Sequence, residues 1–147
     1  INSKIYETLN NGVYRCGFAT SHKAYEVAFK KLFVCLDELE SRLSNQRFLL
    51  GSRITEADWR LFTTLIRFDS VYYSHFKTNL RRILDYPELH GYTCDLYQQP
   101  GIKQTVDFQH IKQHYFYSHE TINPTRIVPI GPEINFEVTH YREKIFG

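Results

Sequence analysis

The sequence has 147 residues, of which 42% are apolar and 23% charged. This balance is too apolar for a disordered chain and too often interrupted by charge for a membrane span, so we expect one soluble domain over residues 1–147. Eighteen Lys and Arg against sixteen Asp and Glu leave a formal charge of +2, which is too small for the positive field of phosphate-backbone binders. We therefore expect neither nucleic acid nor a membrane as a partner.

Three cysteines, Cys16, Cys35 and Cys94, stand far apart in the chain. An odd count at wide spacing builds neither a disulfide framework nor a four-cysteine zinc site, so we expect a reducing, cytoplasmic compartment. The chain starts at Ile1 without a charged-then-apolar leader, which favours a piece of a longer protein. Aromatic residues reach 16%, with eleven Tyr, and Tyr can line a pocket for an aromatic ligand while offering hydrogen bonds.

The first half of the chain predicts three helices. Residues 3–10 form the end of one, stopped by Asn-Asn-Gly at 10–12. Thr20 or Ser21 caps the second, an amphipathic helix of roughly six turns that continues to Leu43. The third begins with a capping box of Thr55 and Asp58, flanked by a hydrophobic staple of Ile54 and Trp59, and runs to about Tyr73 as the core helix.

The second half predicts shorter elements and an extended tail. Pro87 begins a helix that ends at Gln-Pro-Gly, residues 99–101, and a single turn covers 102–106. Asp107 caps the last helix, and the proline-rich tail 121–132 suits an extended strap along the surface. Because no paired-strand pattern is present, the predicted class is all-α, a helical bundle.

Several motifs now show a family likeness. The capping box at the start of a buried helix resembles the sixth-helix motif of the carboxy-terminal domain of glutathione transferases. Other stretches, which together cover nearly all of the chain, resemble the glutathionyl-hydroquinone reductases, the Xi class of glutathione transferases. These stretches are residues 10–14 (NNGVY), 17–20 (GFAT), 60–62 (RLF), 67–69 (RFD), 75–77 (HFK), 97–98 (YQ), 100–102 (PGI), 114–116 (HYF) and 118–125 (SHETINPT).

The resemblance implies a reaction that this chain does not complete alone. Family members carry a preceding thioredoxin-like domain that holds the glutathione site and a catalytic Cys, so we expect 1–147 alone to be inactive. A thiolate attacks the sulfur that joins glutathione to a hydroquinone ring, and a second glutathione resolves the mixed disulfide. The implied partners are an aromatic hydroquinone, glutathione as co-substrate, the preceding domain and a second copy that dimerises through this domain. No metal is implied.

Two tyrosines match the family residues that donate hydrogen bonds to the ring oxygens. They are Tyr14, in NNGVY just past the expected helix stop, and Tyr115, in HYF near the end of the last helix. Hydroxyl donors at these oxygens lower the barrier to departure of the ring. Other rings, such as Tyr72 and Tyr117, are expected at most to line the same pocket, without a role in the reaction. The prediction requires the Tyr14 and Tyr115 hydroxyls to converge.

Other reactive side chains favour structural interpretations. His110, His114 and His119 have spacing that suits a metal, but they lack the carboxylate of a metalloprotease motif, and acid or base roles for His22 or His75 have equally weak support. The three cysteines are expected to pack, Cys16 included, although it lies near Tyr14.

Two arginines on the core helix, Arg60 and Arg67, are expected to be buried on one side of it with Asp69. Ion pairs with Asp58, Asp69 or Glu56, or anchoring of the tail, are favoured over substrate contact. Two alternative functions remain open: a non-catalytic helical module for dimerisation or binding, and a conventional transferase that conjugates glutathione to electrophiles.

Overall fold

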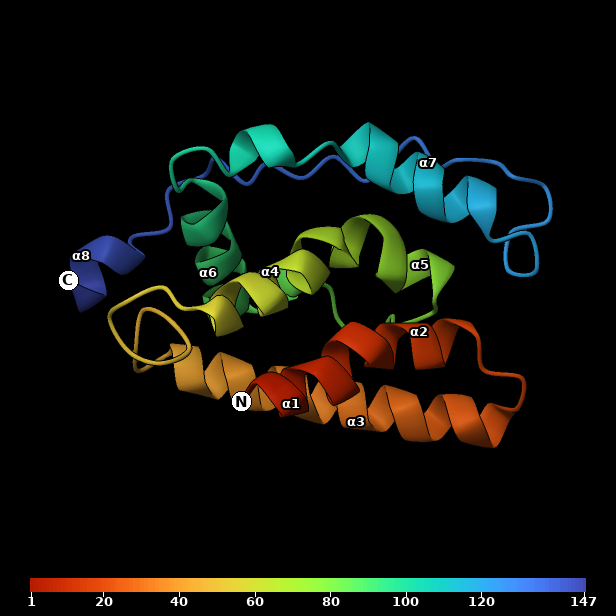
Figure 1. Ribbon diagram of the computed structural model, residues 1–147, viewed down its shortest axis with the longest axis horizontal. Helices are drawn as coiled ribbons and strands as arrows, with labels where there is room; N and C mark the ends of the chain where they lie inside the picture. Colours follow the sequence, from red (N-terminus) through yellow and green to blue (C-terminus); the bar gives the residue numbers. More distant parts are fainter.

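Every regular element of the chain is a helix, which confirms the predicted all-α class (Figure 1). The computed structural model describes all 147 residues, and its one backbone bridge joins Phe48 to Gly51. No helix combines the length and apolar character that a membrane crossing requires. The elements are α1 (Asn2–Ile5), the π-helical turn η1 (Tyr6–Asn10), α2 (Asn11–Gly17), α3 (His22–Leu43), α4 (Glu56–Arg67), the π-helical turn η2 (Phe68–Tyr72), α5 (Tyr73–His75), the 3-10 turn η3 (Ile83–Asp85), α6 (Pro87–Tyr97), the 3-10 turn η4 (Lys103–Thr105), α7 (Phe108–Ser118) and α8 (Arg142–Phe146).

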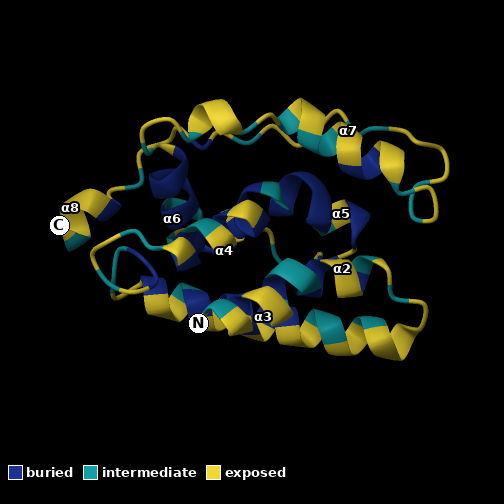
Figure 2. Cartoon of the chain, in the orientation of Figure 1, coloured by how far each residue is buried: buried dark blue, intermediate teal, exposed yellow.

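The helices form layers around the α4–η2–α5 segment. Figure 1 shows α2 and α3 on one side of this segment and α7 with the C-terminal tail on the other. The α2 and α3 helices contact each other, and η2 contacts α7. Figure 2 shows a long buried stretch in the middle segment, and all five residues of η2 are buried. The core helix predicted from 54–73 is therefore confirmed, with a π-helical turn within it.

The predicted helix stop at 10–12 is wrong, because α1, η1 and α2 run on as one continuous helical segment. Its buried face is made by Ile5, Leu9, Val13 and Cys16, which recur every three or four residues, and this burial outweighs the turn preference of Asn-Asn-Gly. Gly12 packs on α3, where an added Cβ would lie 3.7 Å from Leu32. Tyr14 consequently lies inside α2 rather than after a helix end.

The predicted helix starts are confirmed by their capping hydrogen bonds. The Ser21 hydroxyl accepts from the Ala24 N–H at 3.2 Å, and the Asp107 carboxylate accepts from the His110 N–H at 2.9 Å. Asp58 reaches back to the Thr55 N–H at 2.7 Å. These caps satisfy backbone donors that the first turn of each helix would leave without partners.

Asp58 does more than the capping box predicts. Its side chain is fully buried, and its second oxygen accepts from the Leu49 N–H and from the Tyr92 hydroxyl, each at 2.9 Å. One carboxylate therefore joins the 44–55 loop and α6 to the start of α4. A buried carboxylate with this many donors is stabilised, because its charge is fully hydrogen-bonded.

The tail beyond α7 begins with turns at residues 120–125 and has no regular secondary structure over 126–135, and it is held by side chains that donate to its carbonyl groups. Lys112 donates to the Ile130 carbonyl at 2.6 Å, and the Gln98 amide donates to the carbonyls of Phe136 and Val138. The prediction that α7 is the last helix is wrong, since α8 follows the tail. A five-residue helix is too short to show a hydrophobic period.

Candidate functional site

Three tyrosine hydroxyls meet in one hydrogen-bonded chain. The Tyr14 hydroxyl lies 2.7 Å from the Tyr115 hydroxyl, which lies 2.8 Å from the Tyr72 hydroxyl. The rings come from α2, α7 and η2, which are far apart in sequence. The expected convergence of Tyr14 and Tyr115 is therefore observed, while their role stays a prediction. Tyr72 was expected only to line the pocket, and instead its hydroxyl is bonded into the group.

The chain of hydroxyls runs from the interior to the surface. Tyr72 is 3% exposed and Tyr115 6%, whereas Tyr14 is 38% exposed. Three hydroxyls carry three protons, and the two internal bonds use two of them. When Tyr72 donates to Tyr115 and Tyr115 donates to Tyr14, the remaining proton lies on the accessible Tyr14. The arrangement can therefore present one hydrogen-bond donor, backed by two others, to a ligand.

The surroundings keep the phenols of Tyr14 and Tyr72 protonated. Burial, helped by the hydrogen bond to Tyr115, raises the pKa of Tyr14 to about 12. Deeper burial raises the pKa of Tyr72 still further above its usual value of 10.0. The positive charge of Arg67 opposes both increases without cancelling them. At neutral pH the site consequently offers neutral hydroxyl donors rather than phenolates.

The Phe76 ring contacts all three tyrosine rings. It stacks on Tyr72 with ring centroids 5.4 Å apart and lies 5.1 Å from the Tyr14 ring and 6.0 Å from the Tyr115 ring. This position requires glycine at 17, because a Cβ there would lie 2.0 Å from the Phe76 ring. The GFAT and HFK motifs thus meet in space, and the glycine allows the close approach of α2 to Phe76.

A histidine pair extends the aromatic cluster. His75 Nε2 lies 3.0 Å from His119 Nδ1, and the His119 ring stacks on Phe76. Burial, with smaller contributions from the charges of His119 and Lys77, lowers the pKa of His75 to about 4. No group of three or more His, Cys, Asp or Glu side chains is placed to hold a metal ion.

A cleft of about 580 Å³ opens beside the hydroxyls. Arg60 is exposed and forms the expected ion pair with Glu56, at 2.6 Å. Arg67 is half-buried and forms no ion pair; it donates to the Thr63 carbonyl at 2.7 Å. The expected carboxylate partner is therefore found for one arginine and not for the other. The cleft is lined by Tyr6, Asn10, Asn11, Tyr14, Glu56, Trp59, Arg60, Thr63, Thr64, Arg67, Tyr72 and Tyr115.

Asp69 also differs from expectation. It pairs with neither arginine, and its carboxylate accepts from the N–H groups of Ile83 and Leu84 at 2.6 and 3.0 Å. It therefore holds the turn η3 against the core helix. Burial raises its pKa in spite of these bonds. The arginine-aspartate spacing in sequence does not predict this, because the partners are backbone groups.

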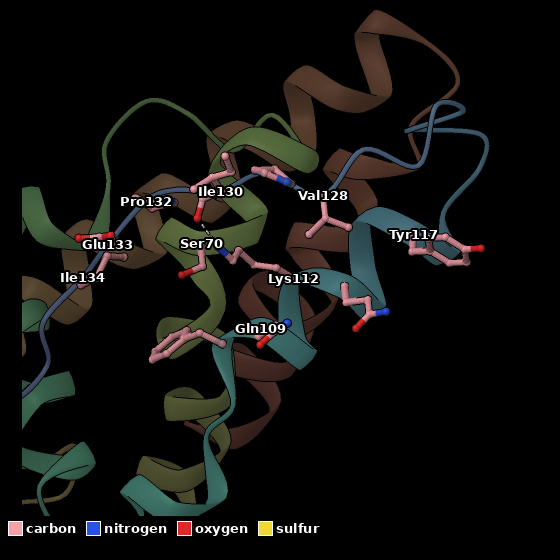
Figure 3. Close-up of a pocket in the computed structure, with 12 residues that line it drawn as sticks. Ser70, Gln109, Lys112, Tyr117, Val128, Ile130, Pro132, Glu133 and Ile134 are labelled. Carbon is pink, nitrogen blue, oxygen red and sulfur yellow. Dashed lines mark hydrogen bonds between the residues drawn. The ribbon is translucent and has the colours of Figure 1, made fainter.

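A second cavity, of about 620 Å³, lies between α7 and the tail (Figure 3). Figure 3 shows Lys112 beneath Ile130 and Ser70 at the same opening. None of its lining residues belongs to the tyrosine cleft. It lacks a cluster of reactive side chains, so the tyrosine cleft is the better candidate for chemistry.

The three cysteines are free and buried. Burial raises the pKa of each thiol to about 11, which leaves little thiolate near neutral pH. Cys16 lies on the buried face of α2 and is therefore poorly suited to act as a nucleophile.

The comparisons with known proteins define the class of this domain. The family model described as glutathione S-transferase, C-terminal domain, matches residues 23–93. Together with the solved structures described below, this match shows that the chain has the fold of a glutathione S-transferase C-terminal domain.

The particular relatives confirm the likeness carried by the motifs. The chain is 53% identical over its whole length to the glutathionyl-hydroquinone reductase YqjG of Escherichia coli, and 54% identical over 90% of its length to the glutathionyl-hydroquinone reductase PcpF of Sphingobium chlorophenolicum. It spans less than half of these relatives, 45% and 42% of their lengths.

Solved structures agree with the relatives. A glutathione-bound structure of YqjG superposes with a TM-score of 0.97, covering 99% of this chain and 47% of that one. A Xi-class transferase from Natrialba magadii, 47% identical, gives 0.95 and covers 97% of this chain and 43% of that one.

Proposed function

We propose that this domain is the substrate-binding half of a glutathione-dependent reductase that removes glutathione from glutathionyl-hydroquinones. The observation that carries the proposal is the chain of three hydroxyls ending at accessible Tyr14. Hydroquinones carry two ring oxygens, and a phenol donor beside an apolar wall suits such a ring. The named activity of YqjG and PcpF supports the same substrate class.

The reaction is a thiol exchange with balanced products. A cysteine thiolate of the preceding domain attacks the glutathione sulfur; a bond between the two sulfurs forms as the bond from sulfur to the ring carbon breaks. The ring carbon takes up a proton, which yields free hydroquinone. A second glutathione then attacks the mixed disulfide, which gives glutathione disulfide and regenerates the cysteine thiolate.

The tyrosines act where charge develops. The ring carbon that carries sulfur takes up its proton first, as a ring hydroxyl loses one, which gives the keto tautomer. When the carbon–sulfur bond then breaks, the electron pair moves to this carbonyl group and negative charge appears on its oxygen, which a proton neutralises to give the hydroquinone. Tyr14 donates a hydrogen bond to that oxygen, and Tyr115 and Tyr72 polarise Tyr14 through their own bonds. A preformed donor in a partly water-excluded site stabilises this charge without reorganising at the moment of reaction.

The remaining parts of the protein follow from this assignment. Glutathione is a co-substrate, held mainly by a thioredoxin-like domain that precedes residue 1. Two copies associate through the helical domain. Because the reaction consumes reduced glutathione, the cytoplasm is the compartment that suits it.

Turnover of a glutathionyl-hydroquinone by the intact protein tests the proposal. We expect Tyr14→Phe and Tyr115→Phe to lower kcat by about a hundredfold, the usual cost of an oxyanion donor, and the double variant to lose little more because the two act as a unit. Tyr117→Phe is the matched control, since Tyr117 is half exposed, lies on α7 together with Tyr115, and is outside the cleft.

Unchanged turnover in the double variant would overturn the assigned roles. The alternatives have their own readouts. Efficient conjugation of glutathione to an electrophile, without release of hydroquinone, would indicate a conventional transferase. Absence of both activities in the intact protein, with a stable dimer in light scattering, would indicate an assembly module.

A further inference from the structure

The charge balance of the tyrosine cleft leaves a single cation without a partner. Three charged side chains line the cleft, and two of them, Glu56 and Arg60, form an ion pair at 2.6 Å. Arg67 forms no ion pair with any carboxylate of the chain, although it is half-buried. The wall beside the hydroxyls therefore carries one net positive charge.

The Arg67 guanidinium also has unused hydrogen-bond donors. Its only bond is from Nη1 to the Thr63 carbonyl, whereas a guanidinium has five N–H donors in a planar fork. The bond to Thr63 ties the side chain to the preceding turn of its own helix. Arg67 is thus tethered at one donor while the others remain available to an acceptor in the cleft.

Acids elsewhere on the core helix are already occupied. Asp58 accepts from Leu49 and Tyr92, and Asp69 accepts from the backbone N–H groups of Ile83 and Leu84. Neither carboxylate is available to neutralise Arg67. A bound anion can therefore supply the counter-charge in the cleft.

The position of Arg67 relative to the phenols indicates what kind of molecule this is. Its charge acts on Tyr14 and Tyr72, where it opposes the upward pKa shift caused by burial. A ring whose oxygen is bonded to Tyr14 would place a neighbouring substituent within the same cleft. A carboxylate is the substituent that a guanidinium fork binds best, through two parallel hydrogen bonds.

We propose that Arg67 binds an acidic substituent of the aromatic ligand, so that the cleft selects hydroquinones bearing a carboxylate over uncharged ones. This inference rests on the proposed function for the placement of the ring. It makes Arg67 a specificity-determining residue, which favours glutathionyl conjugates of dihydroxybenzoic acids within the proposed substrate class.

Equilibrium binding to the intact protein tests the inference without any thiol chemistry. The probes are 2,5-dihydroxybenzoate and unsubstituted hydroquinone, measured by titration calorimetry at one fixed ionic strength. We expect the carboxylate to bind about tenfold more tightly, which is the usual gain from a charge-assisted hydrogen bond. Arg67→Gln should abolish the preference, and Arg67→Lys should keep part of it because the charge remains while the fork is lost.

Arg53→Gln is the matched control, because it removes the same charge from an exposed loop residue outside the cleft. It should keep the full preference. Equal binding of the two probes by the parent protein would overturn the inference, as would an undiminished preference in Arg67→Gln. Equal losses in Arg53→Gln and Arg67→Gln would also overturn it, since they would indicate a general effect of net charge. A thermal melt matching that of the parent protein establishes that each variant is folded.

These outcomes are distinguishable from failure of the proposed function. If the parent protein binds the two probes equally but turns over glutathionyl-hydroquinone normally, only the role of Arg67 is refuted. A clear preference for the carboxylate together with no turnover refutes the reductase assignment and leaves an acidic aromatic ligand as the occupant of the cleft.

Discussion

Two regions of this domain are held together by opposite means. At the tyrosine cleft, rings pack on rings: Phe76 contacts Tyr72 and Tyr14, and Gly17 leaves the space for it. At the C-terminal anchor, which we define as α8 and the groups that bind Arg142, a buried guanidinium reaches the backbone. Arg142 is 2% exposed and donates to the carbonyls of Leu43, Gln46 and Arg47 at 2.9, 2.7 and 3.0 Å, and to Glu88 at 2.5 Å.

The difference teaches which changes each region tolerates. The cleft depends on shape, so it should be most sensitive to added volume, because close-packed rings have little room to move. The anchor depends on one charged donor set, so it should be sensitive to loss of the guanidinium whatever the volume of its replacement.

Arg142→Met should have the largest effect on stability. The substitution keeps much of the side-chain length but leaves three carbonyls and Glu88 without their donor, so we expect the free energy of unfolding to fall by about 3 kcal/mol or more. Urea denaturation measures the loss, and hydrogen exchange should show it first in residues 133–147. Glu143→Gln, on the exposed side of the same helix, should change stability by no more than about 0.5 kcal/mol.

Equal effects of Arg142→Met and Glu143→Gln would contradict the anchor. So would exchange that accelerates at α2 before it does in the tail, since that would mean that Arg142 supports the whole bundle evenly.

Gly17→Ala should have the next largest effect, through one added methyl group. Its Cβ would lie 2.0 Å from a Phe76 ring that is fully buried and stacked on Tyr72, so the ring must shift. We expect a loss of about 1–3 kcal/mol in unfolding free energy, the usual cost of overpacking, and weaker turnover as the tyrosine rings move. Chemical denaturation and the hydroquinone-release assay measure the two effects.

Gly12→Ala is the matched control on the same helix. Its Cβ would lie 3.7 Å from Leu32, an ordinary contact, and alanine favours the helix by about 1 kcal/mol over glycine. This variant should therefore be as stable as the parent or more so. Similar losses at both glycines would show that helix flexibility, and not the space for Phe76, explains glycine at position 17.

The same contrast explains how much of the fold the sequence could predict. Burial period and capping residues predicted the α3, α4, α6 and α7 helices, because both signals are carried by side-chain type at short spacing. The continuous α1–α2 segment was missed, since its Asn-Asn-Gly turn signal is overridden by packing of Gly12 on Leu32. The anchor was missed because its acceptors are carbonyl groups, which every residue has.

The site shows the same limit. Motif likeness pointed to Tyr14 and Tyr115, whose hydroxyls meet at 2.7 Å, but not to the hydrogen bond between Tyr72 and Tyr115. Tyr72 lies on the buried helix among other aromatic residues, in a π-helical turn that a helical period of 3.6 residues does not predict. Arg67 was expected to form an ion pair or to anchor the tail, because spacing along a helix shows which residues share a side and not which acids are already occupied.

Mild acid should separate the two regions through His75, whose ring stacks on Phe76 at the tyrosine cleft. Burial, then the charges of His119 and Lys77, lowers the pKa of His75 from 6.5 to about 4 in the folded protein. The unfolded chain therefore binds the proton more readily. The contribution of His75 to stability is fully present above pH 6.5 and is lost as the pH falls toward 4.

Urea denaturation at a series of pH values measures this dependence. His75→Gln, which keeps a group able to bond to His119 but cannot take up a proton, should flatten the slope between pH 6.5 and 4. His22→Gln, at an exposed position, should retain the parental slope. An unchanged slope in His75→Gln would contradict this prediction, since it would mean that His75 does not account for the protons taken up on unfolding between pH 6.5 and 4.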